Sequence, residues 1–294
     1  MNRPSAPAPA PVLPGPLPGP LVGTDWLAPR LGTPGLVVFD ASVGTHRNLP
    51  HRIPGAWPFD LDGRLSDHTS PLPHTMPGTT ALTEELRALG LHDTDTVVVY
   101  DGAGIHSSAR AWWMLRALGF DRAAVLDGGL PAWTAAGLPL DPRPPRYTGP
   151  RGDLTARPRP HLLADSTRVA AALADPDAAV LDARTPGRFA GTAPEPRPGL
   201  RGGHMPGALN LPFGDLLDDT GRMRPPADLR AHFTTLAGPR RTLLLTCGSG
   251  VTACVLALAA HLSGYTDTTV YDGSWTEWGG PSNLPVVAPP ADRR

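Results

Sequence analysis

The chain contains an internal repeat, and this repeat limits its possible folds more than any other feature. Four short segments recur in the same order, each offset by roughly 145 residues, which is the pattern of a duplicated domain. The pairs are Val38-Phe-Asp40 with Val180-Leu-Asp182, Ile53-Pro-Gly-Ala56 with Met205-Pro-Gly-Ala208, Val97–Asp101 with Leu243–Cys247, and Asp127–Trp133 with Asp272–Trp278. A chain of 294 residues has room for two domains of ordinary size. We therefore predict that each half folds into the same unit.

Each half alternates apolar runs with helical segments. In the first half, the sequence predicts strands over 36–40, 96–101 and 123–127, and helices over 83–90 and 107–119. This alternation is typical of an α/β domain in which helices flank a mainly parallel sheet.

The predicted domain boundaries follow changes in composition. Residues 1–20 are rich in proline and alanine and are expected to form a disordered tail. Residues 21–140 form the first predicted domain and residues 161–289 the second. Between them, residues 141–160 are rich in proline and arginine and are expected to form a linker.

The second half carries a cysteine in a sequence context that would make its thiol reactive. An apolar run ends at Cys247, passes through Gly248-Ser-Gly250, and continues into a segment of helical composition that stops at Gly264. This order predicts a strand, a tight loop and a helix, with backbone N–H groups converging on the loop. Such surroundings lower the pKa of a thiol and make it a nucleophile. A buried structural cysteine is the alternative, which the glycine loop disfavours.

The two halves differ at the points that matter for this chemistry. Asp101 stands in the first half where Cys247 stands in the second, so only the second half can use a thiolate. The second half also has about ten more residues between Asp182 and Met205. This insert carries Arg188 and Arg197, which suggests that it binds an anion.

Composition disfavours several other functions. The net charge of −1 gives no general attraction to nucleic acid or to a membrane surface. The apolar run over 251–262 is shorter than the roughly 20 residues that a membrane span needs. With two cysteines and no signal sequence, we expect a reducing, cytoplasmic location. The histidines lack the spacing of metal ligands, so no metal site is expected.

From about residue 21 to residue 289, the chain resembles the tandem rhodanese-type sulfurtransferases, and specifically their 3-mercaptopyruvate sulfurtransferase branch. The motifs that carry the resemblance are Ile53-Pro-Gly-Ala56, Ser70-Pro-Leu-Pro-His74, Ala111-Trp-Trp113, Gly187-Arg-Phe189, Pro194-Glu-Pro-Arg197, Cys247-Gly-Ser-Gly-Val-Thr252 and Tyr271–Trp278. The resemblance implies a catalytically silent first domain and an active loop at the domain interface. It further implies that Cys247 carries sulfur as a covalent persulfide, with no other cofactor. The expected acceptor is a thiol, a thioredoxin-like protein or cyanide.

The choice of donor depends on charge. Thiosulfate-preferring relatives place basic residues directly after the cysteine, whereas here Gly248 and Ser249 are uncharged. Arg188 and Arg197 match the family's positions for binding the keto acid. We therefore expect 3-mercaptopyruvate as the donor and pyruvate as the product, with thiosulfate as the alternative donor. The loop residues expected to line the substrate site are Gly248, Gly250, Val251 and Thr252.

The resemblance also implies a proton relay formed by Ser249, His74 and Asp62. The spacing between the last two is one residue longer than in relatives, so Asp60 or Asp67 could replace Asp62. His74 could instead cap its proline-rich loop, and Ser249 could supply only a small side chain and an N–H group.

Three other sequence features bear on the function. Arg110 could face the active site from the first domain, but a surface salt bridge is its expected role. A cysteine phosphatase would need an arginine directly after Thr252, but alanine occupies that position. A non-catalytic binding or sulfur-relay scaffold would be expected to carry a damaged loop, whereas this loop is intact.

Overall fold

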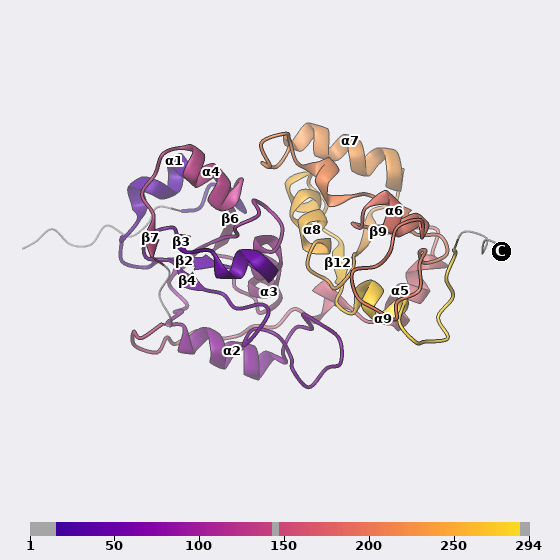
Figure 1. The fold of residues 1–294 in the computed structure, drawn as a ribbon, viewed down its shortest axis with the longest axis horizontal. Coiled ribbons are helices and arrows are strands. Elements are labelled where there is room, and N and C mark those ends of the chain that lie inside the picture. The colour runs from indigo at the N-terminus through magenta and orange to yellow at the C-terminus, as the bar shows by residue number, and fades with distance from the viewer. Residues whose placement is uncertain (1–15, 143–146, 289–294) are drawn as a thin grey trace, which may run out of the picture.

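A computed structural model describes residues 16–142 and 147–288 of the chain. The two halves form two lobes that lie side by side (Figure 1). Each lobe contains a five-stranded sheet in which all neighbouring strands are parallel. The prediction of two α/β domains with parallel sheets flanked by helices is therefore confirmed.

The first sheet has the order β1-β6-β5-β2-β4. Its strands are β1 (Leu21–Val22), β2 (Leu36–Asp40), β4 (Trp57–Pro58), β5 (Thr96–Tyr100) and β6 (Ala123–Leu126). The helices of this lobe are α1 (Thr24–Leu27), α2 (Thr79–Ala88), α3 (Ser108–Ala117) and α4 (Gly129–Ala135). A separate antiparallel pair joins β3 (His51–Arg52) to β7 (Asp141–Pro142).

The second sheet repeats this order as β8-β12-β11-β9-β10. Its strands are β8 (Leu163–Ala164), β9 (Ala178–Asp182), β10 (Leu209–Asn210), β11 (Thr242–Thr246) and β12 (Thr268–Tyr271). Its helices are α5 (Ser166–Leu173), α6 (Pro186–Ala190), α7 (Pro226–Ala237), α8 (Ala253–Leu262) and α9 (Ser274–Trp278). Both central strands, β5 and β11, are buried almost throughout, because helices cover both faces of a parallel sheet.

The two lobes share one apolar core where α3 packs against α8. Every residue of α8 from Ala253 to Ala260 is buried, since its own sheet covers one side and α3 the other. This position explains why the α8 sequence is apolar all round rather than amphipathic. The buried Trp112 of α3 lies edge-on to the His261 ring of α8, with 5.9 Å between ring centroids.

Two matching hydrogen bonds cross between the lobes. The Met76 N–H of the first lobe donates to Asp272 Oδ2 at 2.9 Å, and the Met223 N–H of the second lobe donates to Asp127 Oδ1 at 2.8 Å. Asp127 and Asp272 occupy corresponding positions in the repeat. Each lobe therefore reaches over the carboxyl end of the other lobe's sheet, which places a loop of the first lobe beside Cys247.

The structure differs from the sequence expectations at the start of α2, at the end of the tail and at the start of the linker. Helix α2 begins at Thr79, four residues before the expected start at Thr83, because the threonines and alanine before Thr83 continue the same turn. The folded first lobe begins before residue 20, where the predicted tail ends. Leu17 packs on the hydrophobic core of this lobe, and the Pro20 carbonyl accepts from Val125 N–H at 2.8 Å. Residues 1–15 of that tail lie outside the described residues.

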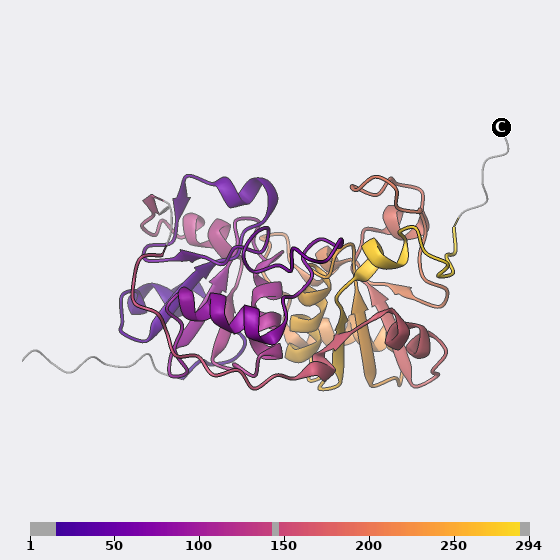
Figure 2. The ribbon, with the colours of Figure 1, turned by 90° about the horizontal axis from the view of Figure 1, so that it is seen from below.

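Most of the predicted linker lies against the first lobe (Figure 2). Backbone bonds from Gly152, Leu154 and Arg157 reach the carbonyls of Arg87, Leu91 and Leu118. The first residues of this segment, Asp141–Pro142, form β7. Residues 143–146 lie outside the described residues.

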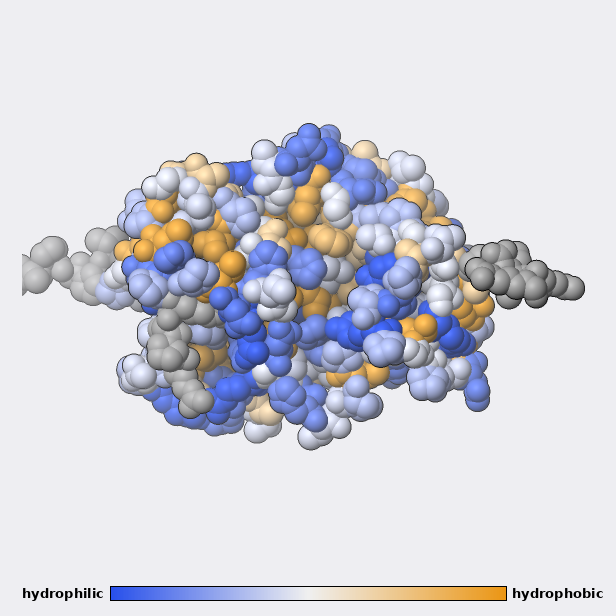
Figure 3. Space-filling view, in the orientation of Figure 1, coloured by the Kyte–Doolittle hydropathy of each residue, from blue (hydrophilic) through white to orange (hydrophobic). Residues whose placement is uncertain are grey.

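The visible surface is mixed in character. Hydrophilic and hydrophobic residues are interspersed over both lobes (Figure 3). Among the described residues, Val287 is the exposed large apolar side chain, at 44%. None of the helices in the described ranges combines the length and the apolar character needed to span a bilayer.

Candidate active site

Cys247 follows directly after β11, at the carboxyl end of the second sheet, and is 1% exposed. The loop after it turns at Gly250, whose φ of +75° favours glycine, and leads into α8. The backbone N–H groups of Gly248, Ser249, Val251 and Thr252 donate to no acceptor within 16–142 and 147–288. They therefore remain available to stabilise an anion at the loop centre.

The corresponding loop of the first lobe shows why that lobe cannot do the same chemistry. Asp101 Oδ2 accepts from the N–H groups of His106, Ser107 and Ser108 at 2.8–2.9 Å, and Oδ1 accepts from Ala103 N–H at 2.9 Å. The side chain is 1% exposed. A built-in carboxylate thus occupies the N–H groups that a sulfur anion would need.

Ser274 is part of the cysteine loop, although the sequence analysis did not identify it. Its Oγ accepts from the N–H groups of Cys247 at 3.2 Å and Gly250 at 3.0 Å, and it lies 4.0 Å from Cys247 Sγ. Ser274 is fully buried and has a φ of +49°, which is uncommon outside glycine. Its position in the repeated Asp-Gly motif was the available signal. The Ser274 hydroxyl therefore holds the backbone of the Cys247 loop in place.

The structure brings Asp62, His74 and Ser249 together. His74 Nε2 lies 2.9 Å from Asp62 Oδ1, and its Nδ1 lies 3.0 Å from Ser249 Oγ. An ionised Asp62 can only accept, so Nε2 carries the proton of a neutral His74, and the Ser249 hydroxyl donates to Nδ1. The three groups could therefore pass a proton across the domain interface. Their part in catalysis stays a prediction.

The two alternative aspartates have other partners. Asp60 forms an ion pair with Arg47, and Asp67 accepts from the backbone and hydroxyl of Thr69. Asp62, in contrast, accepts from the Gly44 N–H as well as from His74. Burial alone would raise its pKa, but these hydrogen bonds and the nearby charges outweigh burial and lower it.

His74 has a neutral resting state. Burial is the main cause that lowers its pKa below the ordinary 6.5, and Asp62 opposes this effect without cancelling it. The positive charges of Arg197 and Arg110 lower the pKa further. A neutral imidazole is the form that can accept a proton.

Arg188, in the insert of the second lobe, is oriented by a buried carboxylate that the sequence analysis missed. Its Nη2 and Nε lie 2.5 and 3.2 Å from Glu195 Oε2, and Glu195 is 3% exposed. The other oxygen of Glu195 accepts from Arg184 at 2.8 Å. Arg184 is fully buried, binds Asp182, and stacks 4.0 Å above the Trp275 ring. This chain of alternating charges fixes the insert to the second sheet.

A cavity of about 370 Å³ joins these groups. It is lined by residues of both lobes and includes all ten predicted site residues except Gly250, namely Asp62, His74, Arg188, Arg197, Cys247, Gly248, Ser249, Val251 and Thr252. Gly250 belongs to the same loop but does not line the cavity, and a Cβ added there would be 2.8 Å from the Asp272 carbonyl.

Arg110 was predicted to form a surface salt bridge, and this prediction is wrong. Its side chain is 0% exposed and crosses from α3 into the second lobe, where Nη2 lies 2.6 Å from Asp272 Oδ1. The same nitrogen donates to the His74 carbonyl at 2.8 Å. His74 has a φ of +58°. Arg110 therefore stabilises the backbone that presents the His74 ring to Ser249.

No group of three or more histidine, cysteine, aspartate or glutamate side chains in the described parts of the chain is arranged to hold a metal ion. The expectation that the protein needs no metal stays a prediction.

Known proteins share this pair of domains. The sequence pattern of the rhodanese-like domain matches residues 23–136 and 165–280. The chain is 38% identical to 3-mercaptopyruvate sulfurtransferase of Escherichia coli over 275 residues, covering 90% of this chain and 96% of the relative. It is 39% identical to thiosulfate/3-mercaptopyruvate sulfurtransferase 1 of Arabidopsis thaliana over 305 residues, covering 91% and 78%.

The fold comparison agrees with the sequence comparison. The crystal structure of SseA from Escherichia coli, described as a 3-mercaptopyruvate sulfotransferase with a rhodanese fold, superposes with a TM-score of 0.77 at 35% identity. The match covers 87% of this chain and 99% of that one. With two matching domains, a duplicated parallel-sheet fold and a cysteine at the end of a central strand, the chain belongs to the tandem rhodanese-domain sulfurtransferases.

Proposed function

We propose that this sulfurtransferase takes a sulfur atom from 3-mercaptopyruvate onto Cys247, releases pyruvate, and passes the sulfur to a thiol or to cyanide. One observation carries the choice of donor. The cavity combines an uncharged cysteine loop with two arginines, Arg188 and Arg197, which come from the insert rather than from the loop. An arginine outside the loop can bind a carboxylate through paired N–H donors, which suits a donor that carries a carboxylate as well as a sulfur. Thiosulfate has no carboxylate and would use positive charge in the loop itself, which Gly248 and Ser249 do not supply.

The proposed first half-reaction balances as follows. The Cys247 thiolate attacks the substrate sulfur, the carbon–sulfur bond breaks, and the electron pair leaves as the enolate of pyruvate. The substrate thiol proton passes through Ser249 to His74, and His74 returns it through Ser249 to the enolate carbon, which gives pyruvate and a neutral His74. The free N–H groups of the loop stabilise the persulfide, and the arginines bind the carboxylate.

Steady-state kinetics with the two donors test this proposal. We expect kcat/KM for 3-mercaptopyruvate to exceed that for thiosulfate by more than about tenfold, or about 1.4 kcal/mol of transition-state free energy. A preference of the same size for thiosulfate would contradict the charge argument. The proposed cytoplasmic location and the absence of a cofactor remain predictions.

Replacing Arg188 by methionine should weaken the donor step. The variant keeps most of the side-chain length but loses the charge-assisted hydrogen bonds, which are worth about 1.5–3 kcal/mol. We expect kcat/KM for 3-mercaptopyruvate to fall about 10- to 150-fold. Arg64→Met is the control, because the Arg64 side chain is 74% exposed, pairs with Glu85 and does not line the cavity. A loss of less than about threefold in Arg188→Met would argue against a role in carboxylate binding.

The pH dependence should follow His74. Since burial lowers its pKa below 6.5, the neutral form persists into mildly acidic solution, and kcat/KM should fall only below pH 6.5. Asp62 raises the pKa of His74, so Asp62→Asn should move this acid limb to lower pH. An acid limb that moves to higher pH in the variant would exclude His74 as the group that titrates.

A further inference from the structure

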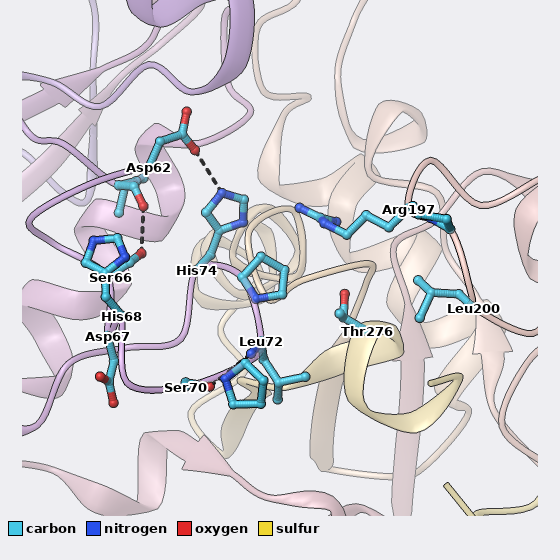
Figure 4. Close-up of a pocket in the computed structure, with 14 residues that line it drawn as sticks. Asp62, Ser66, Asp67, His68, Ser70, Leu72, His74, Arg197, Leu200 and Thr276 are labelled. Atoms are coloured by element: carbon cyan, nitrogen blue, oxygen red, sulfur yellow. Dashed lines mark hydrogen bonds and ion pairs between the residues drawn. The ribbon is translucent and has the colours of Figure 1, made fainter. Parts of the chain in front are cut away.

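A second cavity opens beside the active site (Figure 4). It measures about 570 Å³ and lies between the 66–74 loop of the first lobe and the end of the insert in the second lobe. We infer that this cavity, here called the acceptor cavity, binds the sulfur acceptor as a low-molecular-weight thiol that carries a carboxylate. The inference rests on the proposed function and extends it to the second half-reaction. The residues that carry the argument are Ser70, Leu72, His74, Arg197, Leu200 and Thr276.

The acceptor cavity adjoins the active cavity. Asp62, His74 and Arg197 line both of them. Figure 4 shows the Arg197 guanidinium pointing toward the His74 ring from the opposite side. Cys247 lines only the active cavity. A molecule in the acceptor cavity therefore contacts the His74 and Arg197 side chains that also border the cavity of the cysteine.

The charge at this junction favours a carboxylate. The Arg197 side chain makes no hydrogen bond or ion pair within the described ranges, whereas Arg188 is bound to Glu195. An arginine without a partner can bind a carboxylate on either side of the junction. Because pyruvate leaves before the acceptor reacts, Arg197 can bind the donor carboxylate first and the acceptor carboxylate afterwards.

The walls suit a small organic molecule. Leu72 and Leu200 supply apolar surface from the two lobes, and Ser70 and Thr276 supply hydroxyl groups. The cavity wall that contains Thr276 is held against the cysteine loop, because Thr276 Oγ1 and the Thr276 N–H lie 2.5 and 2.9 Å from the Gly248 carbonyl. The volume falls within the usual range for small-molecule sites, about 300–1,000 Å³. A two-atom acceptor such as cyanide needs none of these walls.

The transfer step balances without a further reactant. The bound thiol gives its proton through Ser249 to His74, and the resulting thiolate attacks the outer sulfur of the Cys247 persulfide. The sulfur–sulfur bond breaks, and its electron pair stays on Cys247 Sγ. The acceptor leaves as a persulfide that takes the proton back from His74 through Ser249, and the Cys247 thiolate and the neutral His74 are restored.

Leu72→Trp tests the site, since a tryptophan there fills the cavity without replacing a cavity residue shared with the active site. Thr69→Trp is the matched control, because Thr69 belongs to the same loop but does not line the cavity. In Leu72→Trp, the KM for N-acetylcysteine should rise at least about tenfold. Turnover with cyanide and the single-turnover release of pyruvate should stay unchanged in both variants. An unchanged KM for N-acetylcysteine, or an equal loss with cyanide, would overturn the inference.

Two further comparisons complete the test. In the wild-type protein, N-acetylcysteamine should show a higher KM than N-acetylcysteine, because it lacks only the carboxylate. Equal KM values would refute the role of Arg197. A defect of Leu72→Trp confined to reduced thioredoxin would overturn the inference in favour of a protein acceptor.

The inference and the proposed donor can fail separately. If the wild-type protein releases no pyruvate from 3-mercaptopyruvate, the proposed donor is wrong. The persulfide can then be formed with inorganic polysulfide, and the acceptor measurements can be made on that loaded enzyme.

Discussion

Replacing Cys247 by serine is expected to lower kcat/KM for sulfur transfer by more than about 10³-fold, since every step of the proposed reaction passes through this sulfur. The serine is nearly isosteric, and Cys247 donates its backbone N–H to Ser274, which the substitution keeps. The fold should therefore persist. The measurement is steady-state transfer to cyanide with circular dichroism as the check on folding.

Cys254→Ala is the matched control for this variant. Cys254 is fully buried in the first turn of α8, and its thiol donates to the Gly250 carbonyl at 3.2 Å. Burial raises the pKa of the Cys254 thiol to about 12, so it stays protonated and cannot act as a nucleophile at neutral pH. We expect the alanine variant to keep kcat/KM within about tenfold of the wild-type value. Equal losses in the two variants would indicate that the loop structure, not the Cys247 sulfur, limits transfer.

Replacing Arg110 by alanine is expected to destabilise the folded protein by about 3 kcal/mol, at the lower end of the cost of breaking a buried ion pair. Arg110 is fully buried and its partner Asp272 is only 17% exposed, so Asp272 would lose its charge partner in a poorly solvated place. The His74 carbonyl would also lose its donor. Sulfur transfer should fall together with stability, because the same contacts position His74.

Urea denaturation followed by fluorescence, with activity measured in parallel, tests this prediction. Arg159→Ala provides the comparison, because the Arg159–Asp121 pair has side chains 32% and 52% exposed, and such pairs contribute about 1 kcal/mol or less. If Arg110→Ala is no less stable than Arg159→Ala, the ion pair between the lobes does not stabilise the interface. Arg110→Lys separates the two effects, since it restores charge without the planar contact to both acceptors.

The architecture could be predicted from the sequence because its signals are local. The strands over 36–40, 96–101 and 123–127 appear within one residue of their expected ends, and the helix over 107–119 appears as α3. Apolar runs and the repeat depend only on the order of residues along the chain. The start of α2 was less well predicted, since threonine and alanine give no sharp N-terminal signal.

The side-chain partners of the site could not be predicted in the same way. Arg110 and Asp272 are 162 residues apart in sequence, and Ser274 reaches a loop that begins 27 residues before it. Glu195 lies close to Arg188 in sequence, but its burial and its second partner, Arg184, depend on how the insert folds back. Such contacts are set by how the loops pack within the second lobe and between the two lobes, which a single sequence does not reveal.

The first lobe gives a physical reason for the loss of activity that the sequence only suggested. Asp101 was expected to be silent because a carboxylate is not a thiol. The structure adds that this carboxylate accepts four loop N–H groups, so the anion site is already filled from within. In the second lobe the N–H groups of Gly248, Ser249, Val251 and Thr252 donate to no acceptor in the described part of the chain, and the cysteine takes the position of the aspartate.

In the proposed reaction, Cys247 accepts one sulfur atom from 3-mercaptopyruvate. The most direct test mixes the protein with 3-mercaptopyruvate in the absence of an acceptor, then measures pyruvate and the intact mass. We expect one pyruvate released and one sulfur atom gained per chain, with the added sulfur on the peptide that contains Cys247. Sulfur on Cys254, or pyruvate release that persists in Cys247→Ser, would contradict it.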